Sequence, residues 1–324
     1  MHKFRFILPV ALLFALLYSC SSPNNTEQIG PVKIIRYEQD LFNIDNNNLK
    51  QGLLELKAKY PIFLGGDLDD TLNMIQLAEY INDPMIRKFY SDCMAKYPSM
   101  EWLEEDMGEL QSKYIEQFEG TKPFPVFTYV SGLDYSHAIV FLDSMMLISL
   151  DMYLGPVYQD YDKLGIPRYI SRRFQQDNII RDAAESMLET HNSPTKENTI
   201  IAEMLEGGKI LYGIETLLPK AKKAIIANYT EEQMKWCFDN EKELWAFLVK
   251  NELLFSSDPK YKQQLLMEGP STPEFMDNAP ARLGEFAGWQ IIKSYHKKNP
   301  QITLQQIFDN QDYNEILRDS GYKP

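Results

Sequence analysis

The chain has 324 residues, a formal net charge of −13 and only four histidines. An acidic surface repels nucleic-acid phosphates and anionic headgroups, so the charge argues against nucleic-acid binding. Because 44% of the residues are hydrophobic and 12% aromatic, the chain can bury a substantial core and is not a disordered stalk.

The first twenty residues predict a secretory signal that ends in a lipid-attachment site. A positively charged start precedes an apolar run, residues 7–18, which is too short to remain as a membrane-spanning helix. A small residue and then Cys20 close this run, as in a lipobox. We therefore expect residues 1–19 to be a lipoprotein signal peptide, Cys20 to carry the lipid and residues 20–30 to form a flexible tether. The alternative is an ordinary cleaved signal followed by a chance cysteine.

Residues 31–324 predict a single α+β domain that is mostly helical, because we find no internal repeat and no long linker. A strand or edge-like segment is expected at 31–41. Apolar residues at helical spacing, together with start and stop signals, predict helices at 49–60, 71–80, 85–94, 100–118, 172–190, 198–218, 230–254, 280–295, 304–308 and 313–318.

A change of pattern marks residues 124–149, where short β-rich runs alternate with turn residues. We expect a small antiparallel sheet there. Further along, Thr230 and Gln233 fit a capping box at a helix start. Gly284 and Gly288 lie four residues apart, which would let another backbone approach closely.

Cys93 and Cys237 are the cysteines that follow Cys20. They could pair in an oxidising periplasm. Because each lies on a helical pattern beside apolar neighbours, two separate buried thiols are the favoured interpretation.

Several motifs, in their order and spacing, resemble the gliding-motility lipoproteins of the GldB family of the Bacteroidetes. They are the lipobox, Ser131-Gly132-Leu133-Asp134-Tyr135, Leu150-Asp151-Met152-Tyr153-Leu154-Gly155, Glu206-Gly207-Gly208-Lys209-Ile210-Leu211-Tyr212, Trp236-Cys237, Asn240-Glu241, Pro280-x-Arg282-Leu283-Gly284, Gly288-Trp289-Gln290-Ile291-Ile292 and Tyr322-Lys323-Pro324. The resemblance implies a lipid-anchored accessory protein of gliding motility and the associated protein export. We expect it at the outer membrane, facing the periplasm, with other envelope proteins as partners.

That family is similar in turn to zinc peptidases of the zincin type, and the resemblance implies a zincin-like fold. In those enzymes an HExxH helix supplies two histidine ligands, and a second helix with an E-G pair supplies a third. Glu206-Gly207 resembles that pair, and the 172–190 helix takes the place of the HExxH helix. A second alignment places Ala202-Glu203-x-x-Glu206 on the same motif.

Neither alignment offers two imidazoles at i and i+4, which zinc binding on one helix face requires. The inward pairs of the 172–190 helix are Ile180/Ala184, Ala183/Met187 and Ala184/Leu188. We therefore predict a pseudo-enzyme that uses no metal and no cofactor.

The residues expected to line a relic cleft are Asp151, Tyr153, Glu203, Glu206, Arg282, Glu285 and Trp289. Each also has a structural interpretation. Asp151 and Tyr153 could shape a turn, Glu206 could pair with Lys209, and Arg282 could pair with Glu285 beside a packed indole.

Two functional alternatives remain open beside the accessory role. One is a degenerate hydrolase acting on peptides or cell-wall material through Glu203, Glu206 or Glu285. The other is a module that holds a peptide or glycan in the relic cleft without cutting it.

Overall fold

The computed structural model describes residues 29–142, 144–193, 196–272 and 275–324. The predictions for the signal peptide, for Cys20 and for nearly all of the tether lie outside these residues. Within them, no helix combines the length and the apolar character that a membrane crossing requires.

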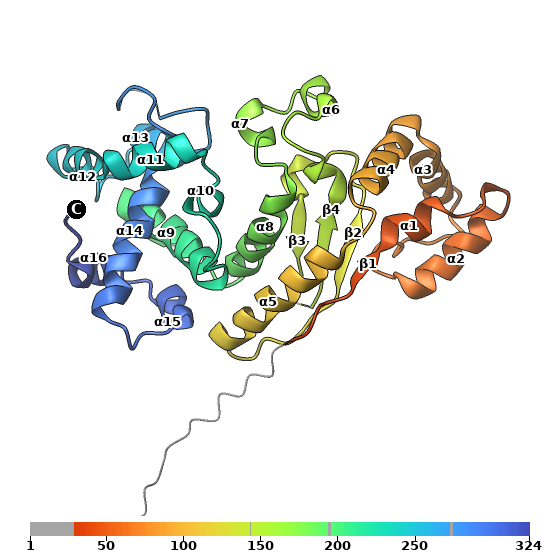
Figure 1. The fold of residues 1–324 in the computed structure, drawn as a ribbon, viewed down its shortest axis with the longest axis horizontal. Helices are drawn as coiled ribbons and strands as arrows, with labels where there is room; N and C mark the ends of the chain where they lie inside the picture. Colours follow the sequence, from red (N-terminus) through yellow and green to blue (C-terminus); the bar gives the residue numbers. More distant parts are fainter. Residues whose placement is uncertain (1–28, 143, 194–195, 273–274) are drawn as a thin grey trace, which may run out of the picture.

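A small central sheet separates two groups of helices (Figure 1). On one side lie α1 (Tyr37–Phe42), α2 (Leu49–Lys59), α3 (Thr71–Asn82) and α4 (Pro84–Lys96). Helices α5 (Glu101–Gln117) and α8 (Gln176–Glu189) lie beside the sheet, with the short α6 (Gln159–Lys163) and α7 (Arg168–Ser171) near its end. On the other side lie α9 (Ile200–Leu217), α10 (Lys223–Ile226), α11 (Glu231–Asp239), α12 (Glu241–Lys250), α13 (Pro259–Leu266), α14 (Leu283–Lys298), α15 (Leu304–Asp309) and α16 (Tyr313–Ser320). Short 3-10 helices lie at Asn46–Asn48, Tyr135–His137 and Leu150–Tyr153.

The sheet is mixed, so the expectation of an antiparallel sheet is wrong. Its strands are β1 (Ile34–Arg36), β2 (Val126–Tyr129), β3 (Ile139–Phe141) and β4 (Met146–Ser149), in the order β1-β2-β4-β3. β1 pairs with β2 and β2 with β4 in parallel, while β3 and β4 form an antiparallel hairpin. Parallel neighbours need long crossover connections, and helices α1–α5 supply the one between β1 and β2. The strand order makes β1 and β3 the two edge strands of the sheet.

Local capping side chains fix several helix starts. The Asp70 side chain accepts from the Leu72 amide at 2.7 Å, and Asp83 caps α4 ahead of Pro84. The Thr230 capping box is confirmed, because Gln233 N donates to Thr230 Oγ at 3.1 Å and Thr230 N to Gln233 Oε1 at 3.0 Å.

Two predicted elements are divided in the structure, and a third starts later than expected. The 31–41 segment is strand only at β1 and then becomes α1. The helix predicted at 172–190 is α8, which begins only at Gln176, because residues 172–175 form a turn in which the carbonyl of Phe174 accepts from the Gly155 amide at 2.9 Å. The 230–254 helix breaks at Asn240 into α11 and α12.

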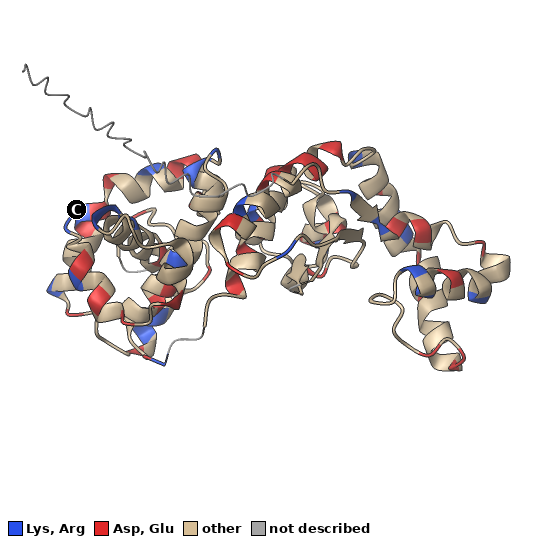
Figure 2. Ribbon diagram, turned by 90° about the horizontal axis from the view of Figure 1, so that it is seen from below, with Lys and Arg blue, Asp and Glu red and all other residues tan. Residues whose placement is uncertain are grey.

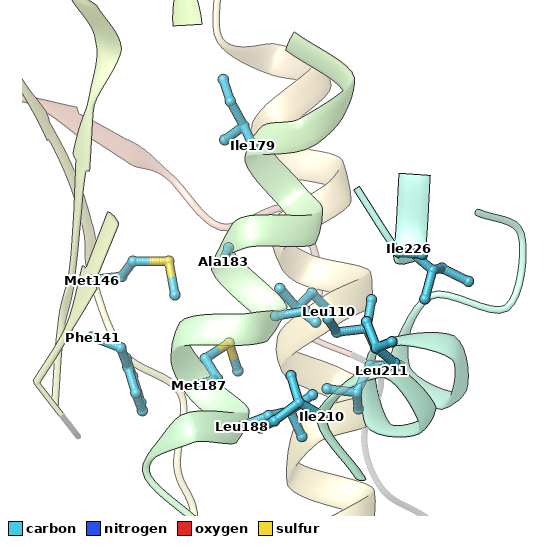
Figure 3. Packing of buried hydrophobic residues seen from close by; sticks show 14 of the residues in the cluster. Leu110, Phe141, Met146, Ile179, Ala183, Met187, Leu188, Ile210, Leu211 and Ile226 are labelled. Atoms are coloured by element: carbon cyan, nitrogen blue, oxygen red, sulfur yellow. The ribbon is translucent and has the colours of Figure 1, made fainter. Parts of the chain in front are cut away.

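Helix α8 is the centre of the packed interior (Figure 3). Ile179, Ala183 and Met187 on α8 are fully buried. Figure 3 shows Met146 and Phe141 of the sheet on one side of α8, with Leu110 of α5 and Leu211 of α9 on the other. One helix therefore joins the sheet to the C-terminal helices, and its remaining face is free to line a site.

Helices α9 and α14 cross at glycines. A Cβ atom at Gly288 would lie 1.8 Å from the carbonyl oxygen of Met204, and one at Gly208 would lie 2.3 Å from the carbonyl carbon of Gly288. At Gly284 a Cβ would lie 3.1 Å from the Leu265 carbonyl oxygen. The close backbone approach expected of Gly284 and Gly288 is confirmed.

Cys93 lies on α4 and Cys237 on α11, and both are buried free thiols. Burial raises the pKa of each thiol, that of Cys237 to about 12. The interpretation as two separate thiols is confirmed.

Candidate functional site

A polar hollow of about 190 Å³ lies between the edge strand β3 and helix α8. We call it the polar cleft. Its lining combines Ala138 and Ile139 at the strand with Asp182, Glu185, Ser186 and Glu189 of α8, together with Tyr135, Ser136, Tyr153, Arg173, Phe174 and Asn228. The cleft therefore has backbone on one wall and carboxylates on the other.

Helical spacing places the acids of α8 on one face. Asp182, Glu185 and Glu189 are three and four residues apart, so their side chains project from neighbouring turns. Ser186 joins this face to the sheet, since its hydroxyl accepts from the Phe141 amide at 3.1 Å. Tyr153 contributes from the sheet side, and its hydroxyl donates to Asp182 Oδ2 at 2.9 Å.

Arg181 is the counter-ion of these acids, and its side chain is fully buried. Its Nη1 donates to Asp182 Oδ1 at 3.0 Å and also to Glu185 Oε2. Its Nε donates to the Ile226 carbonyl at 3.1 Å. Its Nη2 is buried and has no hydrogen-bond partner among the described residues. The guanidinium therefore occupies the interior beside the cleft and neutralises its wall.

The pKa values of the cleft acids diverge. Burial raises the pKa of Asp182, and pairing with Arg181 offsets this only in part. Burial also opposes ionisation of Glu185, but the charge and hydrogen bond of Arg181 outweigh it, so the pKa of Glu185 is lowered. Burial and then the charge of Glu185 raise the pKa of Glu189. Glu185 is therefore the acid that most firmly keeps its charge.

A second arginine cluster is built around Arg282, which precedes α14 with a left-handed φ of 57°. Its Nη1 lies 3.1 Å from Glu285, its Nε lies 3.2 Å from Glu268, and its Nη2 donates to the Ala227 carbonyl at 2.8 Å. Burial raises the pKa of Glu285 although Arg282 opposes this. The predicted alternative of an Arg282–Glu285 ion pair is thus what the structure contains.

Three arginines bind the end of α10 and the two residues that follow it. Successive carbonyls, those of Ile226, Ala227 and Asn228, accept hydrogen bonds from Arg181, Arg282 and Arg172 respectively. The side chain of Asn228 also accepts from Asn178 at 2.7 Å. This segment is fixed between the polar cleft and the C-terminal helices.

Asp151 is fully buried and performs a structural role. It accepts from the amides of Ser131, Gly132 and Leu133 at 3.0, 2.8 and 2.8 Å. The hydroxyl of Ser149 donates to it at 2.7 Å. Asp151 therefore fixes the turn after β2, and of the pair predicted from the sequence only Tyr153 reaches the cleft.

Glu203, Glu206 and Trp289 have separate surroundings outside the polar cleft. Glu203 pairs with Lys262, whereas Glu206 lies 2.8 Å from the buried Lys209. Trp289 is fully buried and donates to a carboxylate oxygen of Glu215 at 2.8 Å. The structure brings Arg282 and Glu285 together but leaves these other residues apart.

The sequence reasoning missed Arg173, Asp182, Ser186, Glu189 and Asn228. Acids at i, i+3 and i+7 were the available signal, but a solvated helix face has the same pattern. Over the whole fold, acidic and basic residues are interspersed along the helices (Figure 2), so charge pattern does not single out the cleft.

The donor set of the cleft does not fit zinc. No histidine lines it, and the best-ionised carboxylate is already paired with a guanidinium. Among the described residues, no group of three or more His, Cys, Asp and Glu side chains is arranged to hold a metal ion.

Comparison with known protein families identifies the family of the chain. The profile of the family described as gliding motility protein GldB matches residues 19–324. Searches of curated proteins and of solved structures found no match. The chain therefore belongs to the GldB family and is a gliding motility-associated protein.

Proposed function

We propose that the protein is a lipid-anchored accessory of the envelope machinery for gliding motility and the associated protein export. The lipid on Cys20 holds it at the outer membrane, facing the periplasm, and it acts through contacts with other envelope proteins. The match to the GldB family and the signal pattern of residues 1–20 support this proposal. Because the net charge is acidic, the protein surface repels anionic headgroups, so membrane attachment depends on the lipid.

The protein acts without catalysis, as a pseudo-enzyme on a zincin-like scaffold. The observation that carries this is the burial of Arg181 between Asp182 and Glu185. A metallopeptidase needs a divalent cation at such a wall, because the metal-bound water is the nucleophile. Here the guanidinium of Arg181 supplies the positive charge, and it cannot activate a water molecule as a metal ion does. The position of α8 beside an antiparallel edge strand supports the zincin-like ancestry.

Complementation of a deletion strain tests the accessory role. Glu185→Gln removes the firmly ionised cleft carboxylate, and Glu79→Gln is the matched change at an exposed carboxylate outside the cleft. A non-catalytic role predicts that both variants restore gliding. A hydrolytic activity of the purified protein on peptides or cell-wall fragments that Glu185→Gln abolishes would defeat the proposal.

Lipid attachment is tested separately with Cys20→Ala. We expect the variant to lose palmitate labelling, to leave the outer-membrane fraction and to fail in complementation. Labelling that persists in Cys20→Ala would show that the lipid is elsewhere or absent.

The free edge of β3 favours a second candidate, in which the polar cleft holds an extended peptide. Ser149 N donates to the Ala138 carbonyl at 2.9 Å, so the next pair, Ile139 and Ile148, is a non-hydrogen-bonded pair. The amide and carbonyl of Ile139 therefore point away from β4 toward the cleft that this residue lines. A peptide strand could add at Ile139 through backbone hydrogen bonds, whereas the next outward amide, that of Phe141, already donates to Ser186 Oγ at 3.1 Å.

Ile139→Pro tests this candidate, because it removes an outward N–H without removing a bond to β4. Peptide binding by the wild-type protein, weakened in Ile139→Pro but not in Ile139→Ala, which keeps the outward N–H, would support it. Binding of glycans alone, unaffected by Ile139→Pro, would reject it.

A further inference from the structure

A small pocket of about 130 Å³ lies where the α7–α8 connection meets the segment after α10. We call it the Arg172 pocket. Its lining is Arg172, Arg173, Gln175, Asn178, Ala224, Ile225, Asn228, Tyr229 and Thr230. Apart from the side chains of Ala224 and Ile225 and the ring of Tyr229, the lining is polar or charged, so the pocket suits a small polar group.

Arg172 is the uncompensated cation of this region. Arg173 and Arg282 both lie 3.2 Å from Glu268, and Arg282 also pairs with Glu285. Arg172 has no acidic partner among the described residues, and its one hydrogen bond there goes to the Asn228 carbonyl at 3.2 Å. A guanidinium has five N–H donors, so most of its hydrogen-bonding capacity remains for a ligand.

The electrostatic surroundings of Arg172 point to an anion. Burial, and then the charge of Arg282, lower the pKa of Arg172, and the charge of Glu268 offsets this only in part. A carboxylate in the pocket would offset both effects and could accept two parallel hydrogen bonds from the guanidinium.

The Arg172 pocket opens into a larger hollow of about 620 Å³, which we call the long groove. The two share Gln175, Ala224, Ile225, Tyr229 and Thr230. This volume falls within the range of about 300–1,000 Å³ that is usual for ligand sites. The floor of the groove is apolar, and it comes from α8, the end of α9, and α10 with the loop before it: Ile180, Leu217, Leu218, Pro219, Ala221, Ala224 and Ile225.

The charges around the long groove distinguish a peptide from a fatty acid or a lipid. Two of its lining lysines have acidic partners, since Lys220 lies 3.2 Å from Glu109 and Lys222 lies 3.8 Å from Glu231, whereas Lys113 has no ion pair among the described residues. The lining acids still outnumber the lysines, because Asp106, Glu109, Asp177 and Glu231 face Lys113, Lys220 and Lys222. Asp106 also lines the groove, and burial followed by repulsion from Glu109 raises its pKa. The groove thus has the cation of Arg172 at one end and the acid of Asp106 elsewhere along it. An occupant that complements both carries an anion and a cation on an apolar chain.

We propose that the Arg172 pocket binds the C-terminal carboxylate of a partner protein, whose last apolar residues lie in the long groove. A basic side chain upstream in that tail would meet Asp106. This site is distinct from the polar cleft, with which the pocket shares Arg173 and Asn228, and the inference does not depend on peptide addition at β3.

The experiment uses a library of random heptapeptides on an array, prepared once with free C termini and once as C-terminal amides. The fluorescently labelled protein is the probe. We expect enrichment of free carboxylates that follow two apolar residues, with a basic residue upstream. The amide forms should bind at least about tenfold more weakly, because a charge-assisted bidentate pair is lost.

Arg172→Met should weaken the selected peptides by about tenfold or more, for the same loss of a charge-assisted pair. Arg168→Met is the matched control, since Arg168 is exposed and pairs with Asp162. Ala221→Trp obstructs the groove without changing the pocket, and it keeps the test valid if Arg172→Met does not fold. No enrichment, equal binding of amides, or displacement of the peptides by palmitate at equal concentration would overturn the proposal.

Discussion

Replacing Arg181 with methionine is the perturbation that most directly challenges the described cleft. The substitution keeps an unbranched apolar stem but removes a fully buried guanidinium with hydrogen bonds to Asp182, Glu185 and the Ile226 carbonyl. Removing one partner of a buried ion pair costs about 3–5 kcal/mol. The acids retain side-chain exposures of 17% and 32%, so water can compensate part of this. We expect a loss of about 2–4 kcal/mol in the free energy of unfolding.

The loss should depend on pH. In the wild type the pKa of Glu185 is lowered, so its contribution to stability is present at neutral pH and fades as pH falls through its pKa. Without Arg181, burial alone would raise the pKa of Glu185, so the variant should gain stability as the pH falls. The difference between the two proteins should therefore be greatest near pH 7 and shrink toward pH 4.

Urea unfolding at a series of pH values measures both effects. Arg181→Met/Glu185→Met is the companion variant, and it should be more stable at pH 7 than Arg181→Met alone, because it removes the unpaired charge as well. A free energy of unfolding for Arg181→Met equal to that of the wild type, or a deficit that does not change with pH, would refute the reasoning.

Three further predictions concern the scaffold. Gly288→Ala should lower the free energy of unfolding, measured in urea, by about 3 kcal/mol or more, because its Cβ would lie 1.8 Å from the Met204 carbonyl oxygen. Gly30→Ala is the neutral control, because no atom lies within 4 Å of its Cβ. Lys163 and Lys88 lower the pKa of Asp160 to about 2. The free energy of unfolding of the wild type should therefore fall by about 1–2 kcal/mol as the pH falls from about 4 to 2. Unfolding measured by circular dichroism should show no such acid-dependent loss in Asp160→Asn. Asp151→Ala should cost about 3 kcal/mol and speed hydrogen exchange at the amides of residues 131–133, and unchanged exchange there would contradict its structural role.

Local signals in the sequence predicted local structure well. The capping box at Thr230 and the close approach at Gly288 depend on residues near in the chain or on the absence of a side chain, so the pattern contains them. The break at Asn240 is different, because apolar residues continue at helical spacing on both sides of it. The pairing of β1 with β2 is set by a crossover of many residues, which no short pattern encodes.

The site was harder to predict than the fold, for a physical reason. Glu185 and Glu189 look like an ordinary solvated acidic face until the edge strand and Arg181 are placed against them. Asp151 looks like a site residue because it follows a strand, yet its oxygens are taken by backbone amides. In both cases the partner that decides the role is distant in sequence or belongs to the backbone.

The metal content of the protein, purified from the cell envelope without chelators, tests the central claim most directly. If the guanidinium of Arg181 is the counter-ion of the cleft, elemental analysis should find no stoichiometric transition metal, and Glu185→Gln should change nothing. One zinc ion per chain that disappears in Glu185→Gln would contradict the account.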